Sequence, residues 1–357
     1  MPASEHIFIK ACRREQTERT PVWIMRQAGR YLPEYRKIRE KTDFLTLCKT
    51  PELASEVTIQ PVDIIGVDAA ILFSDILVVP EAMGMPLELI ESMGPVFHEP
   101  IRNSAQVEKL SIPDVRDKLS FVMDAVRLTK DRLKNRVPLI GFSGSPWTLA
   151  SYMVEGKGSK DFKFIKGLIY SDPALAHKLL EKLAQVVTEY LSAKIDAGCD
   201  AVQIFDTWAG VLTPQDFREF SLRYMSQIVQ GIKSKNVPII VFAKGAFHSL
   251  KQIAETGCDV VGLDWTMDIG LARKEIGNNV ALQGNLDPTV LFAPQHIIEN
   301  EVCSILGKYG YGNGHIYNLG HGILPDTPVE NAKFFVNIVK ELGVRYHQQK
   351  QESVINK

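Results

Sequence analysis

Two arginines separated by a short turn predict a binding site for an anionic ligand. Arg26 and Arg30 flank the tripeptide Gln27-Ala28-Gly29, directly after the apolar segment 21–25. A guanidinium can donate two parallel hydrogen bonds to one carboxylate. Two guanidiniums on one loop therefore indicate a clamp for carboxylates.

A second basic cluster follows this loop. Arg36, Lys37 and Arg39 lie in a helix-like run with Glu34 and Glu40. Opposite charges at helical spacing are typical of a solvated helix face. We interpret this run as surface rather than as part of a site.

Three aspartates stand where a short apolar run ends, at Asp75, Asp206 and Asp264. An aspartate after a strand most often caps the following loop. We favour that structural role for Asp206 and Asp264, and we keep Asp75 as a candidate for chemistry.

Two further side chains are candidates for ligand contact. His321 lies between Gly320 and Gly322, which favours close approach of a ligand to the imidazole. Tyr152 follows a Gly-Ser-Pro-Trp turn, and its hydroxyl could point at a ligand. The other seven histidines are scattered and show no metal-binding spacing.

The elements that position these residues are indicated by a repeated pattern of Gly-x-Asp, an apolar run and a carboxylate. This pattern begins at Gly66, Gly198 and Gly257. It is typical of a helix that ends at glycine, followed by a tight turn and a buried parallel strand.

Eight short apolar segments are predicted to be strands, and they alternate with stretches of helical periodicity such as 173–197 and 214–235. The segments are 21–25, 69–73, 137–142, 201–205, 237–242, 260–263, 280–284 and 315–320. No G-x-G-x-x-G follows the first of them, so a single (β/α)8 TIM-type barrel is favoured over a doubly wound sheet. The active site of such a barrel lies at the C-terminal ends of its strands, where all the candidates above would meet.

Composition limits the function classes. The 357 residues carry a formal net charge of -1, which excludes a global basic field for nucleic acid. No apolar run approaches a membrane span, and residues 1–20 do not have the pattern of a signal peptide. Five widely spaced cysteines without a C-x-x-C favour a reducing cytoplasm over disulfides or a zinc site. We expect one domain over 1–357, with a polar N-terminal segment 1–20 and a frayed tail at about 347–357.

Several segments resemble signatures of the uroporphyrinogen decarboxylase family. The segment 21–35 (PVWIMRQAGRYLPEY) is similar to the first signature, and 141–148 (GFSGSPWT) is similar to the second. Three shorter segments also match: 73–77 (FSDIL), 283–288 (QGNLDP) and 318–322 (NLGHG). The resemblance extends from about Pro21 to Val336, and the nine-residue run MRQAGRYLP is highly specific.

The resemblance implies an enzyme on a (β/α)8 barrel, usually a homodimer, that needs no cofactor or metal. It would remove the four acetate carboxyl groups of uroporphyrinogen III as CO2 and give coproporphyrinogen III, in porphyrin and haem biosynthesis. The family's substrate loop corresponds to Arg26, Gln27, Ala28, Gly29 and Arg30, and its essential aspartate to Asp75. Its other substrate-contacting residues correspond to Tyr152, Thr207 and His321.

The implied chemistry agrees with these residue types. The substrate carries eight carboxylates, and Arg26 and Arg30 would supply part of the cationic rim that it needs. Loss of CO2 leaves a carbanion, and a protonated pyrrole ring can accept its electron pair. The carboxylate of Asp75, beside the pyrrole N–H groups, would stabilise that cation. Arg26, Tyr152, His321 or water could deliver the second proton.

Two alternatives use the same fold or the same pocket. A corrinoid-linked methyltransferase would activate a thiol on zinc with His and Cys ligands, but 242–247 reads FAKGAF without His-x-Cys, and Cys258 precedes its strand. A non-catalytic tetrapyrrole-binding protein would keep the arginines but would not need Asp75.

Overall fold

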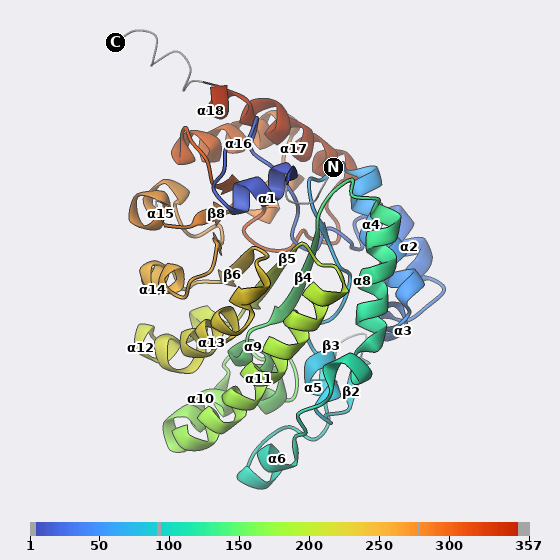
Figure 1. Ribbon diagram of the computed structural model, residues 1–357, viewed down its shortest axis with the longest axis vertical. Helices are drawn as coiled ribbons and strands as arrows, with labels where there is room; N and C mark the ends of the chain where they lie inside the picture. Colours follow the sequence, from blue (N-terminus) through green and yellow to red (C-terminus); the bar gives the residue numbers. More distant parts are fainter. Residues whose placement is uncertain (1–4, 91–93, 278, 349–357) are drawn as a thin grey trace.

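A curled parallel sheet forms the centre of the molecule in the computed structural model, which describes residues 5–90, 94–277 and 279–348 (Figure 1). Seven strands lie in the order β1-β4-β5-β6-β7-β8-β9, and every neighbouring pair is parallel. Their bounds are β1 (Ala70–Ile71), β4 (Leu139–Gly144), β5 (Ala201–Asp206), β6 (Ile239–Ala243), β7 (Val260–Gly262), β8 (Ala281–Gln283) and β9 (His315–Ile316).

The first predicted strand closes this sheet into a barrel. Val22 forms a parallel bridge with Tyr317, which follows β9. The carbonyl of Val22 accepts the N–H of Asp68, which precedes β1. The barrel thus has eight staves, by which we mean the seven strands and the segment at 21–25. This segment is the first stave in chain order, although it makes too few ladder bonds to be a regular strand. The predicted (β/α)8 barrel is confirmed.

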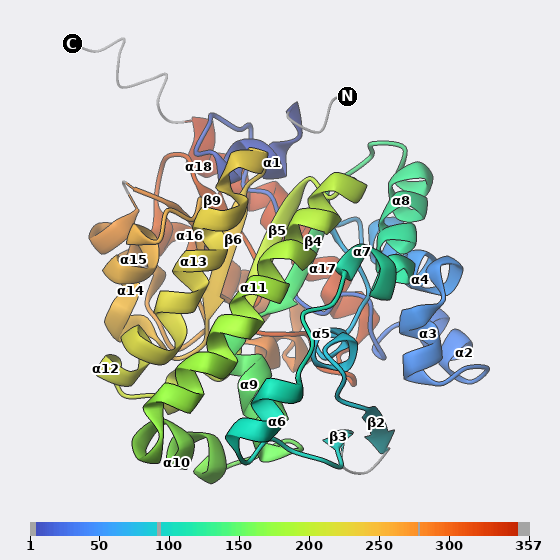
Figure 2. The same ribbon diagram turned by 60° about the horizontal axis from the view of Figure 1, so that its bottom comes forward.

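Helices cover the outside of the barrel, with one outer helix after each stave (Figures 1 and 2). They are α4 (Pro51–Ile64), α8 (Ser120–Leu133), α11 (Pro173–Ala197), α13 (Arg223–Ile232), α14 (Leu250–Glu255), α15 (Ile269–Ile276), α16 (Gln295–Tyr309) and α17 (Val329–Gly343). The predicted helix 173–197 is confirmed, and 214–235 is helical with a π-helical turn at Arg218–Leu222. None of the helices in these described ranges has the length and apolar character needed to cross a membrane.

Further elements lie in the connections. The helices are α1 (Ile7–Cys12), α2 (Pro33–Arg39), α3 (Phe44–Lys49), α5 (Val78–Ala82), α6 (Ser104–Lys109), α7 (Val115–Lys118), α9 (Pro146–Glu155), α10 (Lys163–Ser171), α12 (Pro214–Phe217) and α18 (Arg345–Gln348). An antiparallel hairpin of β2 (Leu87–Ile90) and β3 (Gly94–Phe97) was not predicted, because its strands are only half-buried and lack a clear apolar alternation. The predicted frayed tail lies mostly outside the described residues.

The aspartate of each Gly-x-Asp repeat joins two neighbouring staves at the N-terminal end of the barrel. The main-chain N–H of Asp68, Asp200 and Asp259 donates to the carbonyl of Val22, Leu139 and Ile239, respectively. The carboxylate of each aspartate accepts the N–H of that same residue, at 2.8–2.9 Å. Each aspartate thus fixes which residue of one stave faces the start of the next.

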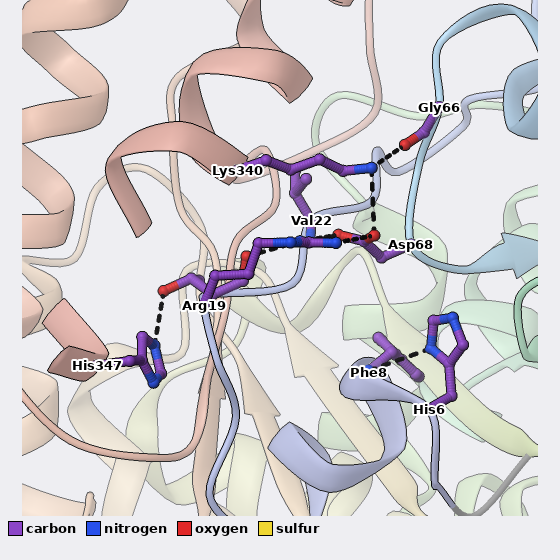
Figure 3. A network of polar contacts seen from close by, with 9 residues as sticks. His6, Phe8, Arg19, Val22, Gly66, Asp68, Lys340 and His347 are labelled. Carbon is purple, nitrogen blue, oxygen red and sulfur yellow. Dashed lines mark hydrogen bonds and ion pairs between the residues drawn. The ribbon is translucent and has the colours of Figure 1, made fainter. Parts of the chain in front are cut away.

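Asp68 carries the most contacts of the three (Figure 3). Its two oxygens accept a bidentate pair of hydrogen bonds from Arg19, both at 2.7 Å, and Lys340 of α17 lies 3.3 Å away. The hydrogen bonds and charge of Arg19 keep the pKa of Asp68 below its usual value, despite an opposing effect of burial. Nearby, the hydroxyl of Thr20 lies 3.2 Å from Nε2 of His347 in α18.

We predict that Asp68→Ala lowers the free energy of unfolding by about 3 kcal/mol, because it leaves Arg19 and the N–H of Val22 without their acceptor. Urea denaturation followed by circular dichroism measures this change. Asp124→Ala is the matched control, because it removes an exposed ion pair with Arg127 and should change stability by less than about 1 kcal/mol. Equal effects of the two substitutions would show that the Asp68 contacts do not stabilise the barrel.

Candidate active site

A cavity of about 440 Å³ opens at the C-terminal ends of the staves. Its lining comes from the loops after the first stave, β1, β5 and β9 and from the end of β4. The lining residues include Arg26, Ala28, Gly29, Arg30, Asp75, Phe142, Phe205, Thr207 and His321. The structure thus brings together seven of the residues predicted from sequence, at the predicted end of the barrel.

Arg26 and Arg30 project from the loop that follows the first stave, and both are exposed. Within the described residues, neither guanidinium forms an ion pair, so both remain available to an anion. The backbone of Arg26 is left-handed, with φ of 62°, an uncommon conformation outside glycine that is found at functional sites.

Gly322 determines where the side chain of Arg26 can lie. A Cβ at Gly322 would be 2.2 Å from Cδ of Arg26, so any other residue here would displace this arginine side chain. Gly320 is approached equally closely, because its Cβ would lie 2.3 Å from the main-chain N of Trp265. Contacts within the protein thus account for Gly320, whereas Gly322 and His321 both line the cavity, and the close approach of a ligand to His321 stays a prediction.

Gln27 differs from its neighbours in the loop, because its side chain is fully buried and is not part of the cavity lining. Its amide oxygen accepts the N–H of Ile24 at 3.1 Å, and its amide nitrogen donates to the carbonyl of Ala69 at 2.9 Å. Gln27 thus ties the loop to the start of β1. Its predicted contact with a ligand stays a prediction.

Arg36 also supports the loop. Its Nη1 donates to the carbonyl of Arg30 at 2.8 Å and to that of Tyr31 at 3.3 Å. Arg36 is exposed and outside the cavity lining, as we interpreted it, but it also braces the loop that carries Arg30. Charge alternation identifies an exposed helix face, but it cannot reveal that one side chain on that face folds back onto a loop.

Asp75 lies beside this cationic loop, at the end of the segment that follows β1. Its Oδ1 accepts the N–H of Leu77 at 2.7 Å. Burial raises the pKa of Asp75, whereas the Leu77 hydrogen bond and the charge of Arg26 lower it. The carboxylate thus combines the expected loop cap with one oxygen that makes no hydrogen bond within the described residues.

The imidazole of His321 faces aromatic rings and two cations. Its ring centroid lies 6.2 Å from that of Phe242 and 6.5 Å from that of Trp265. Burial and the charges of Arg26 and Lys244 lower its pKa to about 3. His321 is therefore a neutral imidazole at physiological pH.

Aromatic rings and hydroxyl groups form much of the remaining wall. The rings of Phe142 and Phe205 are 5.7 Å apart and both line the cavity, which sequence patterns did not identify because these residues also fit a buried strand. Thr207 lines the cavity directly after β5. Tyr152 is not a lining residue, but it lies close enough for the charges of Arg26 and Asp75 to affect its pKa, which burial raises.

Asp206 and Asp264 have structural roles, as predicted. Asp206 is fully buried and accepts hydrogen bonds from the hydroxyls of Ser145, Thr148 and Ser221 at 2.5–2.7 Å. Asp264 accepts the N–H of Gly245 at 2.5 Å. Both carboxylates hold loops around the cavity rather than facing it.

Taken together, the cavity offers cations at its rim, an aromatic wall, and a carboxylate with a raised pKa next to a cation. This set suits a ligand built from small aromatic rings, with several carboxylates and with N–H groups that can face Asp75.

Comparisons with known proteins agree with this description. The family model described as "Uroporphyrinogen decarboxylase (URO-D)" matches residues 3–342. A protein of Chloroherpeton thalassium named "Uroporphyrinogen decarboxylase" is 58% identical over 96% of this chain and 98% of its own length. A protein of the same name from Legionella pneumophila is 55% identical over 96% of this chain and 99% of its own length.

Among solved structures, a methyltransferase from Methanosarcina mazei superposes with a TM-score of 0.80, covering 94% of this chain and 97% of its own. The two sequences are 21% identical, so this similarity concerns the fold alone.

We predict that the ring of His321 does not titrate between pH 8 and pH 5, because its folded-state pKa is about 3. Nitrogen-15 NMR of the imidazole groups measures this, and His321→Gln assigns the signal. Free imidazole in the same buffer is the reference and titrates in this range. A His321 signal with a midpoint near pH 6.5 would contradict the prediction.

Proposed function

The chain belongs to the uroporphyrinogen decarboxylase family, and on that basis we propose how its cavity decarboxylates uroporphyrinogen III. The enzyme removes the four acetate carboxyl groups as CO2 and forms coproporphyrinogen III, a step of porphyrin biosynthesis. The observation that carries our account of the mechanism is the partly buried carboxylate of Asp75 beside the guanidinium of Arg26.

Binding of the substrate depends on opposite charges around an apolar wall. Arg26 and Arg30 bind carboxylates of the acetate or propionate arms, because their guanidiniums are exposed and form no ion pair among the described residues. Ala28 and Gly29 allow the macrocycle to approach the loop backbone, and Phe142 and Phe205 contact its carbon framework. Thr207 and Tyr152 add hydroxyl groups for hydrogen bonds.

Asp75 is the catalytic residue in this proposal. Its free oxygen accepts hydrogen bonds from the pyrrole N–H groups, which holds the macrocycle over the carboxylate. Protonation of one pyrrole ring creates a cation that Asp75 stabilises. The carbon–carbon bond to the carboxyl group then breaks, its electron pair enters the ring cation, and CO2 leaves. A proton added to the resulting exocyclic carbon forms the methyl group, and loss of the proton first added to the ring restores the neutral pyrrole.

His321 has a narrower role than a general acid. With a pKa of about 3, its ring carries only one proton at neutral pH and is a poor source of a second proton. We assign it a hydrogen bond to the substrate. Arg26, Tyr152 and water remain the candidates for proton delivery, and no metal or cofactor is required in this scheme.

We also propose that the chain is a homodimer of the cytoplasm. Phe247, Phe292 and Leu324 are exposed apolar residues on loops after β6, β8 and β9, on the same end of the barrel as the cavity. A second copy would remove them from water, and sedimentation equilibrium should give twice the chain mass.

The free thiols of all five cysteines support a reducing compartment.

The proposed function is tested by anaerobic incubation of the purified chain with uroporphyrinogen III, without added metal or cofactor. The partially decarboxylated intermediates should appear first and coproporphyrinogen III last. Chromatography measures them after oxidation to the corresponding porphyrins. A requirement for a metal or a corrinoid, or binding without turnover, would contradict the proposal.

We predict that Asp75→Asn reduces kcat at least about 100-fold, because the amide keeps the shape of the carboxylate but not the charge that stabilises the pyrrole cation. Asp131→Asn on the exposed face of α8 makes the same chemical change outside the cavity and should leave kcat unchanged. Retention of most activity by the folded Asp75→Asn variant would reject the assignment.

A further inference from the structure

Lys244 lies across the barrel mouth from the arginine loop. It directly follows β6, the fifth of eight staves counted from the segment that carries Arg26. In a closed barrel of eight staves, the first and the fifth are on opposite sides. The main-chain N–H of Lys244 donates to the carbonyl of Asp206 at 3.0 Å, which fixes its position against the loop after β5.

The ammonium group of Lys244 is held without a carboxylate partner. Its Nζ lies 5.2 Å from the centroid of the Trp265 ring, a cation–π distance. In the ranges 5–90, 94–277 and 279–348, it forms no ion pair. The side chain is half-buried, so its stem is restrained while its charge remains accessible.

Two observations place this charge near the cavity. The Trp265 ring lies 6.5 Å from that of His321, which lines the cavity. The charge of Lys244 also contributes to the lowered pKa of His321, an effect that requires the two groups to be close in a poorly solvated region.

We propose that Lys244, held against Trp265, binds a carboxylate of the substrate on the side opposite Arg26 and Arg30. This inference rests on the proposed function. The arms of uroporphyrinogen surround the whole macrocycle, so cations on one loop can neutralise only the carboxylates on one side. Lys244 supplies the matching charge on the other side.

The competing explanation is that Lys244 only packs on Trp265. Measuring ligand affinity and stability in the same variants distinguishes carboxylate binding from packing alone. Lys244→Met keeps the length and apolar stem of the side chain but removes the charge, and Lys244→Arg restores a charge. Lys251→Met, on the exposed face of α14, is the matched control.

Equilibrium binding of uroporphyrin III is measured by fluorescence, together with KM and kcat for uroporphyrinogen III. Lys244→Met should raise both Kd and KM about tenfold, with kcat and Tm close to those of the unsubstituted chain. Lys244→Arg should restore affinity to within about threefold, and Lys251→Met should change nothing. Lys244→Gln, which keeps a polar end group, replaces the Met variant if that variant does not fold.

Unchanged Kd and KM in a folded, uncharged variant would overturn the proposal, as would a loss of affinity that Lys244→Arg does not restore. Coproporphyrin III identifies the arm involved: a loss for both porphyrins assigns a propionate, and a loss for uroporphyrin alone assigns an acetate. If the unsubstituted chain binds uroporphyrin but does not decarboxylate uroporphyrinogen, the proposed function fails. The Kd values of the Lys244 variants for uroporphyrin then still test whether Lys244 binds a carboxylate.

Discussion

The register between the first stave and β1 determines whether this barrel has a functional site, and Asp68 sets that register. Through its N–H and its carboxylate it binds both polar groups of Val22, and Arg19 and Lys340 hold the carboxylate in place. Because side chains alternate along a strand, a slip of one residue would turn the first stave's side chains to the opposite face. The loop of Arg26 would then no longer face Asp75. Contacts at the N-terminal ends of the staves therefore control the geometry of the site at their C-terminal ends.

Different residues of the site are suited to binding an anion and to stabilising a cation. Exposed guanidiniums at the rim are well hydrated and suited to capturing an anion, whereas Asp75 is in surroundings that raise its pKa and that strengthen any interaction with a cation. Arg26 connects the two functions, because its charge favours the ionised form of Asp75. The neutral His321 adds a hydrogen-bonding group without adding to the positive charge near that carboxylate.

The fold and most of the site could be predicted from sequence because both leave local signals. Gly198 ends α11 with φ of 125°, and Asp200 starts the next stave, as the Gly-x-Asp pattern indicates. The roles of Gln27, Arg36 and Gly322 could not be predicted, because each depends on a partner brought close only by folding: the carbonyls of Ala69 and Arg30, and the side chain of Arg26. Nor does any pattern show that an aromatic residue of a buried strand, such as Phe142, faces a cavity instead of the core.

The seam between the first stave and β9 has a consequence for synthesis of the protein on the ribosome. Val22 pairs with Tyr317, and the N–H of Ile323 donates to the carbonyl of Met25 at 2.9 Å, so the arginine loop is held by residues translated almost 300 positions later. Arg26 and His321 lie on the two sides of this seam. A nascent or truncated chain that ends before this point has neither the closed barrel nor the complete cavity. Such a fragment therefore lacks the surface that Arg26 and His321 form together.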